Sequence, residues 1–76
     1  MELKDLRYFC LAAELGSITR AAETLGVSQP FVTKVINRLE EELGTQLFDI
    51  NKRRIVLNTN GEFFYKGAKD IVTRAD

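Results

Sequence analysis

Residues 17–39 read SITRAAETLGVSQPFVTKVINRL, and this stretch decides the fold. Ser17 can cap a helix through its hydroxyl, and Gly26 allows the chain to turn where that helix ends. Ser28 can cap the next helix, whose first turn tolerates Pro30 because the first N–H groups of a helix have no partners within it. Two short helices joined through a glycine-containing turn are typical of a helix-turn-helix.

The small and apolar residues around the turn support this interpretation. Ala22 lies four residues before Gly26, and Val32 lies six residues after it. We expect Ala22 to let the two helices approach closely and Val32 to anchor the second helix on the others. A generic three-helix core would share this spacing, so spacing alone leaves both interpretations open.

The helix predicted over residues 29–43 is amphipathic. Its apolar residues follow a helical stripe, at Val32, Val35, Ile36, Leu39 and Leu43. The opposite face carries amides, a hydroxyl and cations, which can meet base edges or phosphates: Gln29, Thr33, Lys34, Asn37 and Arg38. A solvated surface is the alternative. Residues 40–42 are all glutamate, and because DNA would repel them we expect them to point away or to lie beyond the groove.

The remaining segments complete a mainly α fold. Residues 2–15 predict a first helix, and the alternation of apolar residues over 47–57 predicts a short β-hairpin. Thr59 and Glu62 have the spacing of a capping box, which predicts a last helix running to the end of the chain. We therefore expect a winged helix-turn-helix over residues 1–58, with a three-helix core and a hairpin wing, followed over 59–76 by the start of a linker or dimerisation helix.

Charge is distributed unevenly along the 76 residues. The chain holds 11 Lys and Arg against 11 Asp and Glu. The net charge is nevertheless +2 over residues 17–38, −4 over 40–49 and +3 over 50–54. The cations of the hairpin, Lys52, Arg53 and Arg54, can reach phosphates or the minor groove beside the helix, or they can simply favour solubility.

Composition excludes several classes of function. With no histidine and only Cys10, the chain lacks the ligands of a typical zinc site and any histidine base. Residues 40–42 diverge around a helix, and Cys10 lies on an apolar stripe, so we expect neither an enzyme nor a cofactor. No run of apolar residues is long enough to span a membrane, and the charged N-terminus does not resemble a secretory signal, which predicts a cytoplasmic protein.

The chain resembles a known family, the LysR-type bacterial transcriptional regulators. The motifs are Ser17-Ile-Thr-Arg-Ala21-Ala22, Leu25-Gly-Val-Ser28-Gln29-Pro30, Leu39-Glu40 through Leu43-Gly44, and Leu47-Phe48. The resemblance covers nearly the whole chain. It implies a recognition helix in the major groove of double-stranded DNA, a homodimer formed through the last helix, and, in the full-length protein, a further effector-binding domain and often a tetramer.

The resemblance also implies which residues contact DNA. Carried over position by position, they are Ser28, Gln29, Pro30, Phe31, Thr33, Lys34 and Arg38 of the helix and Arg53 of the wing. The polar face of the helix adds Asn37, and the cations of the hairpin add Lys52 and Arg54. Three positions depart from the family. Ile50 replaces a usual arginine, Phe31 replaces a small residue, and residues 58–60 replace the usual sequence before the last helix.

The last helix has two interpretations. Its apolar residues are too many for one exposed surface, so we expect one part to pack on the first helix through Leu3, Leu6 and Phe9. The remainder would meet a second copy of the chain through Phe64, Ala68, Ile71 and Ala75, which follow the spacing of a coiled-coil seam. Phe64 and Ile71 could instead belong to the core of a monomer. A winged helix that binds protein instead of DNA also remains open.

Overall fold

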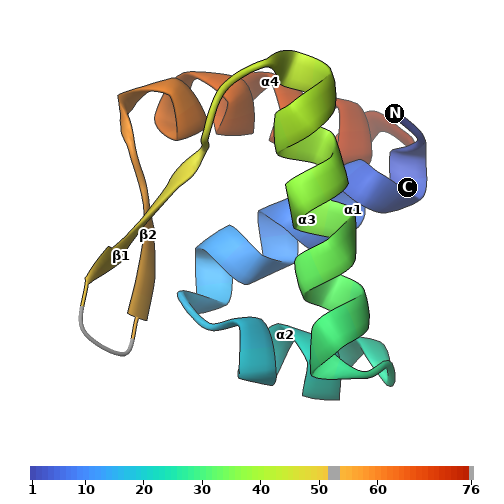
Figure 1. The fold of residues 1–76 in the computed structure, drawn as a ribbon. Coiled ribbons are helices and arrows are strands. Elements are labelled where there is room, and N and C mark those ends of the chain that lie inside the picture. Colours follow the sequence, from blue (N-terminus) through green and yellow to red (C-terminus); the bar gives the residue numbers. More distant parts are fainter. Residues whose placement is uncertain (52–53, 76) are drawn as a thin grey trace.

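The computed structural model describes residues 1–51 and 54–75, and its helices form a small bundle with a hairpin at one side (Figure 1). The elements, in order, are α1 (Leu3–Leu15), α2 (Ile18–Leu25), α3 (Gln29–Leu43), β1 (Phe48–Asn51), β2 (Arg54–Leu57) and α4 (Thr59–Ala75). The winged helix-turn-helix that the sequence predicts is confirmed. None of the described helices is long and apolar enough to cross a membrane.

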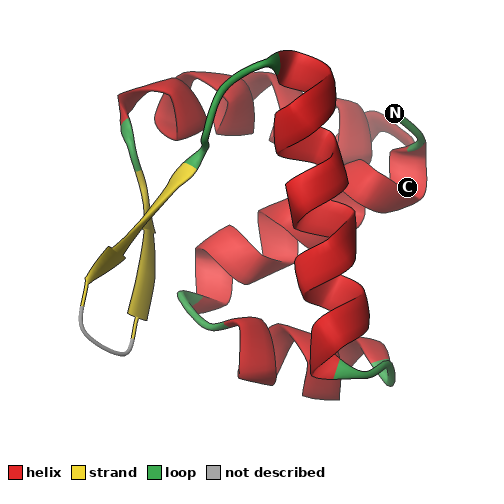
Figure 2. Cartoon of the chain, in the orientation of Figure 1, coloured by secondary structure: helices red, strands yellow, loops and turns green. Residues whose placement is uncertain are grey.

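The caps and the turn of the helix-turn-helix lie where the sequence places them. The Ser17 hydroxyl accepts the Arg20 N–H at 3.1 Å, and the Ser28 hydroxyl accepts the Phe31 N–H at 3.2 Å. Gly26 ends α2 with φ of 72°, a left-handed conformation that costs glycine little and other residues more. The short loop between α2 and α3 therefore follows from local chemistry (Figure 2).

One part of the core holds the helix-turn-helix together. Ala21 and Ala22 of α2 are buried against Val32 and Ile36 of α3, with Ala12 of α1 beneath them. The alanines leave room for close helix contact, and Val32 is fully buried. The predicted roles of Ala22 and Val32 are confirmed.

A second part of the core joins α1 to α4. Leu6, Phe9 and Cys10 of α1 pack with Ala68 and Val72 of α4. The Phe9 ring lies with its centroid 5.3 Å from that of Phe64 and 5.4 Å from that of Phe48. Because aromatic rings bury large areas, Phe9 is the centre at which α4, the hairpin and α1 meet.

This packing corrects part of the predicted role of the last helix. Ala68 is only 2% exposed and packs with α1, whereas Phe64 is half-buried; both also line a groove on the surface of α4 together with Ile71. Leu3, which we expected to pack under α4, is exposed. Residues 64 and 68 and residues 63 and 67 both repeat at the helical step of four. Contact with Leu6 and Phe9 of α1 decides that the row of residues 64 and 68 is the more buried one.

The wing is an antiparallel hairpin. Phe48 pairs with Leu57, Asp49 with Val56, Ile50 with Ile55 and Asn51 with Arg54, which confirms the predicted hairpin. Its second strand is tied to the turn after α1, because the Ile55 N–H donates to the Gly16 carbonyl at 3.3 Å. The predictions for Lys52 and Arg53, and for the side chain of Ile50, lie outside the described residues.

The start of α4 differs from the prediction by one residue. The Asn58 side-chain oxygen accepts the Gly61 N–H at 2.7 Å, and the Asn58 carbonyl accepts the Glu62 N–H at 2.9 Å. Asn58 is therefore the cap, Thr59 is the first helical residue, and the expected capping box of Thr59 and Glu62 is wrong. Asn58 also donates its backbone N–H to Leu47 and its side-chain N–H to Gln46, so contacts with the preceding loop select it.

Candidate nucleic-acid interface

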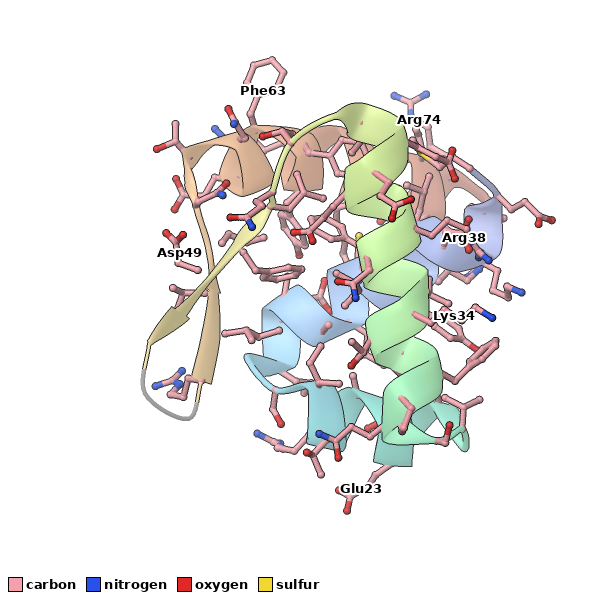
Figure 3. All side chains as sticks on the ribbon, viewed as in Figure 1. Glu23, Lys34, Arg38, Asp49, Phe63 and Arg74 are labelled. Atoms are coloured by element: carbon pink, nitrogen blue, oxygen red, sulfur yellow. The ribbon has the colours of Figure 1, made fainter. Side chains whose placement is uncertain are left out.

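The outward face of α3 carries the candidate DNA-binding residues side by side. Ser28 and all seven candidate residues of the helix are exposed: Gln29, Pro30, Phe31, Thr33, Lys34, Asn37 and Arg38. All of the helical residues except Phe31 line one open concavity along the helix, together with Glu41. The figure shows Lys34 and Arg38 on the same side of α3, with Arg38 next to the start of α1 (Figure 3). The structure thus brings these candidates onto a single polar surface, which we call the α3 face.

The α3 face rests on a rigid apolar back. Val32, Val35, Ile36 and Leu39 are at most 5% exposed and pack against α1 and α2. Closely packed interiors resist displacement, so the rotation of α3 about its axis is fixed. The positive end of the α3 backbone dipole lies at Ser28, where it favours a negatively charged group.

Arg38 differs from the other polar residues of the face because it has a partner on another helix. Its Nη2 atom donates to Asp5 Oδ1 at 3.0 Å. Burial pushes the pKa of the Asp5 carboxyl upward, but the Glu2 N–H and the Arg38 guanidinium outweigh it and hold that pKa below its ordinary value. Asp5 was missed by the sequence analysis, although its position four residues before Phe9 places it on the buried side of α1.

Phe31 packs partly on the protein. Its ring meets Tyr8 edge-on with the centroids 6.0 Å apart, and Lys4 Nζ lies 5.8 Å from its centroid. The side chain is still 39% exposed. Phe31 therefore combines packing on α1 with an open edge next to the α3 face.

Two of the three consecutive glutamates are occupied elsewhere. Glu40 accepts the Leu47 N–H at 2.7 Å, and Glu42 pairs with the N-terminal ammonium of Met1 at 2.8 Å. Glu41 lines the C-terminal end of the concavity on α3. The acidic half of α3 therefore bounds the donor-rich half.

The hairpin lies beside the α3 face across a groove. Thr33 and Asn37 form one wall of this groove, and Gln46, Phe48 and Ile55 contribute to the other. Arg54 is exposed, and its guanidinium lies over the turn at Gly16. Of the three predicted wing cations, Arg54 is the one whose position the structure describes.

An apolar surface lies apart from the α3 face, on α4 and the N-terminus. Phe63 is 83% exposed and Ile71 is 51% exposed, and with Met1 and Gly67 they border a groove that Leu6, Phe64 and Ala68 also line. We call Phe63, Ile71, Met1 and Gly67 the α4 apolar face. Ala75 is also exposed. The sequence analysis missed Phe63, although residues 63, 67 and 71 recur at the helical step of four.

Two further titratable groups of α1, Cys10 and Glu14, lie near α4. Burial, with the nearby Glu14 charge, raises the pKa of Cys10 to about 11. Glu14 accepts the Tyr65 hydroxyl at 2.6 Å and pairs with Lys69 at 2.8 Å, linking α1 to α4. Within residues 1–51 and 54–75, no three cysteine or acidic side chains gather as they would around a metal ion.

Comparison with known proteins agrees with this geometry. Residues 3–62 match the family described as bacterial regulatory helix-turn-helix protein, lysR family. The chain is 47% identical over 76 residues to the transcriptional regulator BudR of Klebsiella aerogenes and 41% identical to BenM of Acinetobacter baylyi. These alignments cover the whole chain but only 53% of that BudR and 25% of BenM, so the chain spans about half or less of the relatives it matches.

Solved structures match over nearly the whole fold. The DNA-binding domain of BenM in complex with benA site 1 DNA superposes with a TM-score of 0.95 at 41% identity, covering all of this chain and 88% of that one. The DNA-binding domain of CbnR in complex with DNA has a TM-score of 0.92 at 39% identity, covering 99% of this chain and 86% of that one. With its helix-turn-helix, wing and exposed α3 face, the chain belongs to the LysR family of bacterial regulatory proteins and is a DNA-binding domain of that non-enzymatic family.

Proposed function

We propose that this chain binds double-stranded DNA in a sequence-specific manner by inserting α3 into the major groove. The observation that carries the proposal is the α3 face, a row of exposed amide, hydroxyl and cationic side chains on a helix whose other side is buried. Gln29 and Thr33 would contact base edges, and Lys34 a base or a phosphate. Arg38 and Arg54, together with Lys52 and Arg53 of the wing, would contact phosphates.

The solved relatives support this proposal. BenM and CbnR were crystallised as DNA-binding domains with DNA, and both share the fold of this chain along its whole length. As part of a longer LysR-type regulator, the chain would direct that protein to its operator.

We propose further that two copies bind together through the α4 apolar face. Phe63 and Ile71 are large apolar side chains left in water, which is unfavourable unless a partner covers them. Phe64 and Ala68 line the same groove as Phe63 and Ile71, and the exposed Ala75 lies further along α4 toward its C-terminus. A symmetric dimer would present two α3 helices to half-sites one helical turn, or a multiple of it, apart. Tetramers of the full-length protein would be a further level of assembly.

The experiment that tests DNA binding is selection of bound sequences from a random duplex pool. A symmetric pair of half-sites is expected, with affinity that falls by about one log unit per log unit of salt for each phosphate contact. A protein-binding winged helix would show no such salt dependence. Absence of duplex binding even at very low ionic strength would refute the proposal.

The role of Gln29 is tested by Gln29→Ala. Loss of a base contact should relax preference at one position of the half-site, at a cost of about 1–3 kcal/mol on the selected sequence and little on random DNA. Arg54→Ala is the matched comparison, because loss of a phosphate contact should weaken binding to both sequences alike. If Gln29→Ala weakened both alike, Gln29 would not read a base.

The dimer is tested by Ile71→Glu in sedimentation experiments. A charge in the α4 apolar face should produce a monomer, since an unpaired charge is costly to bury. Val56→Glu is the control, because Val56 is also an exposed apolar residue but lies on the wing. Unchanged dimer mass for Ile71→Glu would remove the α4 apolar face from the interface.

A further inference from the structure

Arg38 is the cation of the α3 face that a second helix holds in place. Asp5, which holds it, is only 2% exposed, whereas the Arg38 side chain is 46% exposed. One end of this ion pair is therefore anchored in the protein and the other reaches the surface where DNA is proposed to bind. Such a pair does more than link α1 to α3, because it also sets the direction of the guanidinium.

Asp5 is itself held by its position in α1. One carboxylate oxygen accepts the Glu2 N–H at 3.0 Å, as part of the reciprocal cap of α1, and the other accepts Arg38 Nη2 at 3.0 Å. Both oxygens are thus engaged, and α1 and α3 share the rigid core around Leu39 and Phe9. The carboxylate has no freedom to follow a moving arginine, so the arginine must adapt to the carboxylate.

A fixed guanidinium is better prepared to meet a phosphate than a mobile one. Arginine carries five N–H donors in a planar fork, and one bond to Asp5 leaves the others for a second acceptor. A long side chain that is ordered before binding loses less conformational entropy when the complex forms. A carboxylate near DNA also repels phosphate. Neutralising Asp5 should therefore weaken duplex binding if its main role is to orient Arg38, and strengthen duplex binding if its negative charge matters more.

We infer that Asp5 is a positioning residue for DNA binding, which orients the Arg38 guanidinium toward a phosphate beside the α3 face. This inference rests on the proposed function, because it requires that Arg38 contacts DNA. Asp5 does not touch the DNA in this arrangement. Its contribution passes entirely through Arg38.

The experiment is a double-mutant cycle on duplex affinity, made with Asp5→Asn, Arg38→Ala and the double variant. Asp5→Asn is expected to weaken binding about two- to tenfold per protomer, the size of the ordering cost of one long side chain. In the Arg38→Ala background the same change should have no weakening effect. Glu41→Gln is the charge control, since it removes a carboxylate at the end of the same concavity, and it should strengthen binding.

The outcomes separate a positioning role from a structural one. Thermal melting shows whether each variant is folded at the binding temperature. The inference would be overturned if Asp5→Asn weakened binding equally in the parent and Arg38→Ala backgrounds, or if it strengthened binding as Glu41→Gln is expected to do. In either case the proposed function would stand as long as the parent chain binds duplex. An Arg38→Ala variant that binds as well as the parent would also overturn it. Only failure of the parent chain to bind duplex would defeat the proposed function itself.

Discussion

Gly61 offers the sharpest test of how the wing and α4 are joined. A Cβ atom placed on Gly61 would lie 2.0 Å from the carbonyl oxygen of Leu47 and 2.9 Å from Cδ2 of Leu57. The Leu47 carbonyl is backbone, and it also accepts the Asn58 N–H at 2.9 Å, so it cannot move aside without breaking the junction. Gly61→Ala must therefore displace the start of α4 from the loop before the hairpin.

Three contributions determine the change in stability: one favours the variant and two oppose it. Alanine favours a helix over glycine by up to about 1 kcal/mol, which alone would make the variant more stable. Overpacking costs about 1–3 kcal/mol and more when the obstacle is rigid. Loss of the Asn58 cap adds about 1 kcal/mol. Together these contributions make the variant less stable by about 1–4 kcal/mol, compared with the roughly 4–11 kcal/mol available to a domain of this size.

Urea and thermal unfolding at a single protein concentration measure this difference. The expected loss corresponds to a fall in melting temperature of roughly 4–30 °C. Gly67→Ala is the matched control in the same helix, because no described atom lies within 4 Å of its added Cβ atom. Because Gly67 belongs to the α4 apolar face, the variants are compared at a protein concentration that keeps them monomeric. It should leave stability unchanged or raise it by up to about 1 kcal/mol. If both variants were equally stable, or if Gly61→Ala were the more stable, the close contact with Leu47 would be refuted.

Three further outcomes follow from the structure. Asn58→Ala should lower the free energy of unfolding by about 1 kcal/mol, and Thr59→Ala should lower it clearly less. If urea unfolding showed the larger loss for Thr59→Ala, Thr59 would be the cap. Burial raises the pKa of Cys10 to about 11, so its thiol should react with a disulfide reagent near neutral pH only after unfolding, and rapid labelling of the native chain would contradict that burial. Burial acts to raise the pKa of Glu14, but the Lys69 and Tyr65 contacts outweigh it and hold that pKa below its ordinary 4.5. The ionised Glu14 should therefore stabilise the fold at neutral pH, and this contribution should disappear as the pH falls through the lowered pKa. The stability difference between the parent chain and Glu14→Gln should therefore narrow in acid, and a constant difference would argue against the pair.

Where the sequence analysis succeeded, the decisive signals were local. Ser17, Gly26 and Ser28 act through their own backbone and hydroxyl geometry, and the structure places each of them as expected. The hairpin followed from alternation of apolar residues over neighbouring positions. The polar residues of the α3 face followed from helical period, because Gln29, Thr33, Lys34, Asn37 and Arg38 lie opposite the apolar stripe, whereas Pro30 and Phe31 came from the resemblance to the LysR family.

The errors fall where two choices were locally equivalent. Asn58 and Thr59 are both good caps, and the contacts of Asn58 with Gln46 and Leu47 decide between them. Rows 64, 68 and 63, 67 of α4 both repeat with helical spacing, and only the position of Phe9 determines which one is buried.

The sequence by itself thus determined the order of the helices, the turn between α2 and α3 and the polar character of the α3 face, since each depends on residues within a few positions of one another. Only the tertiary structure decided that Asp5 holds Arg38, across 33 residues of chain, and that Phe63 is left exposed while Phe64 is partly buried. Such contacts depend on how packed helices are rotated against one another, which no local pattern specifies.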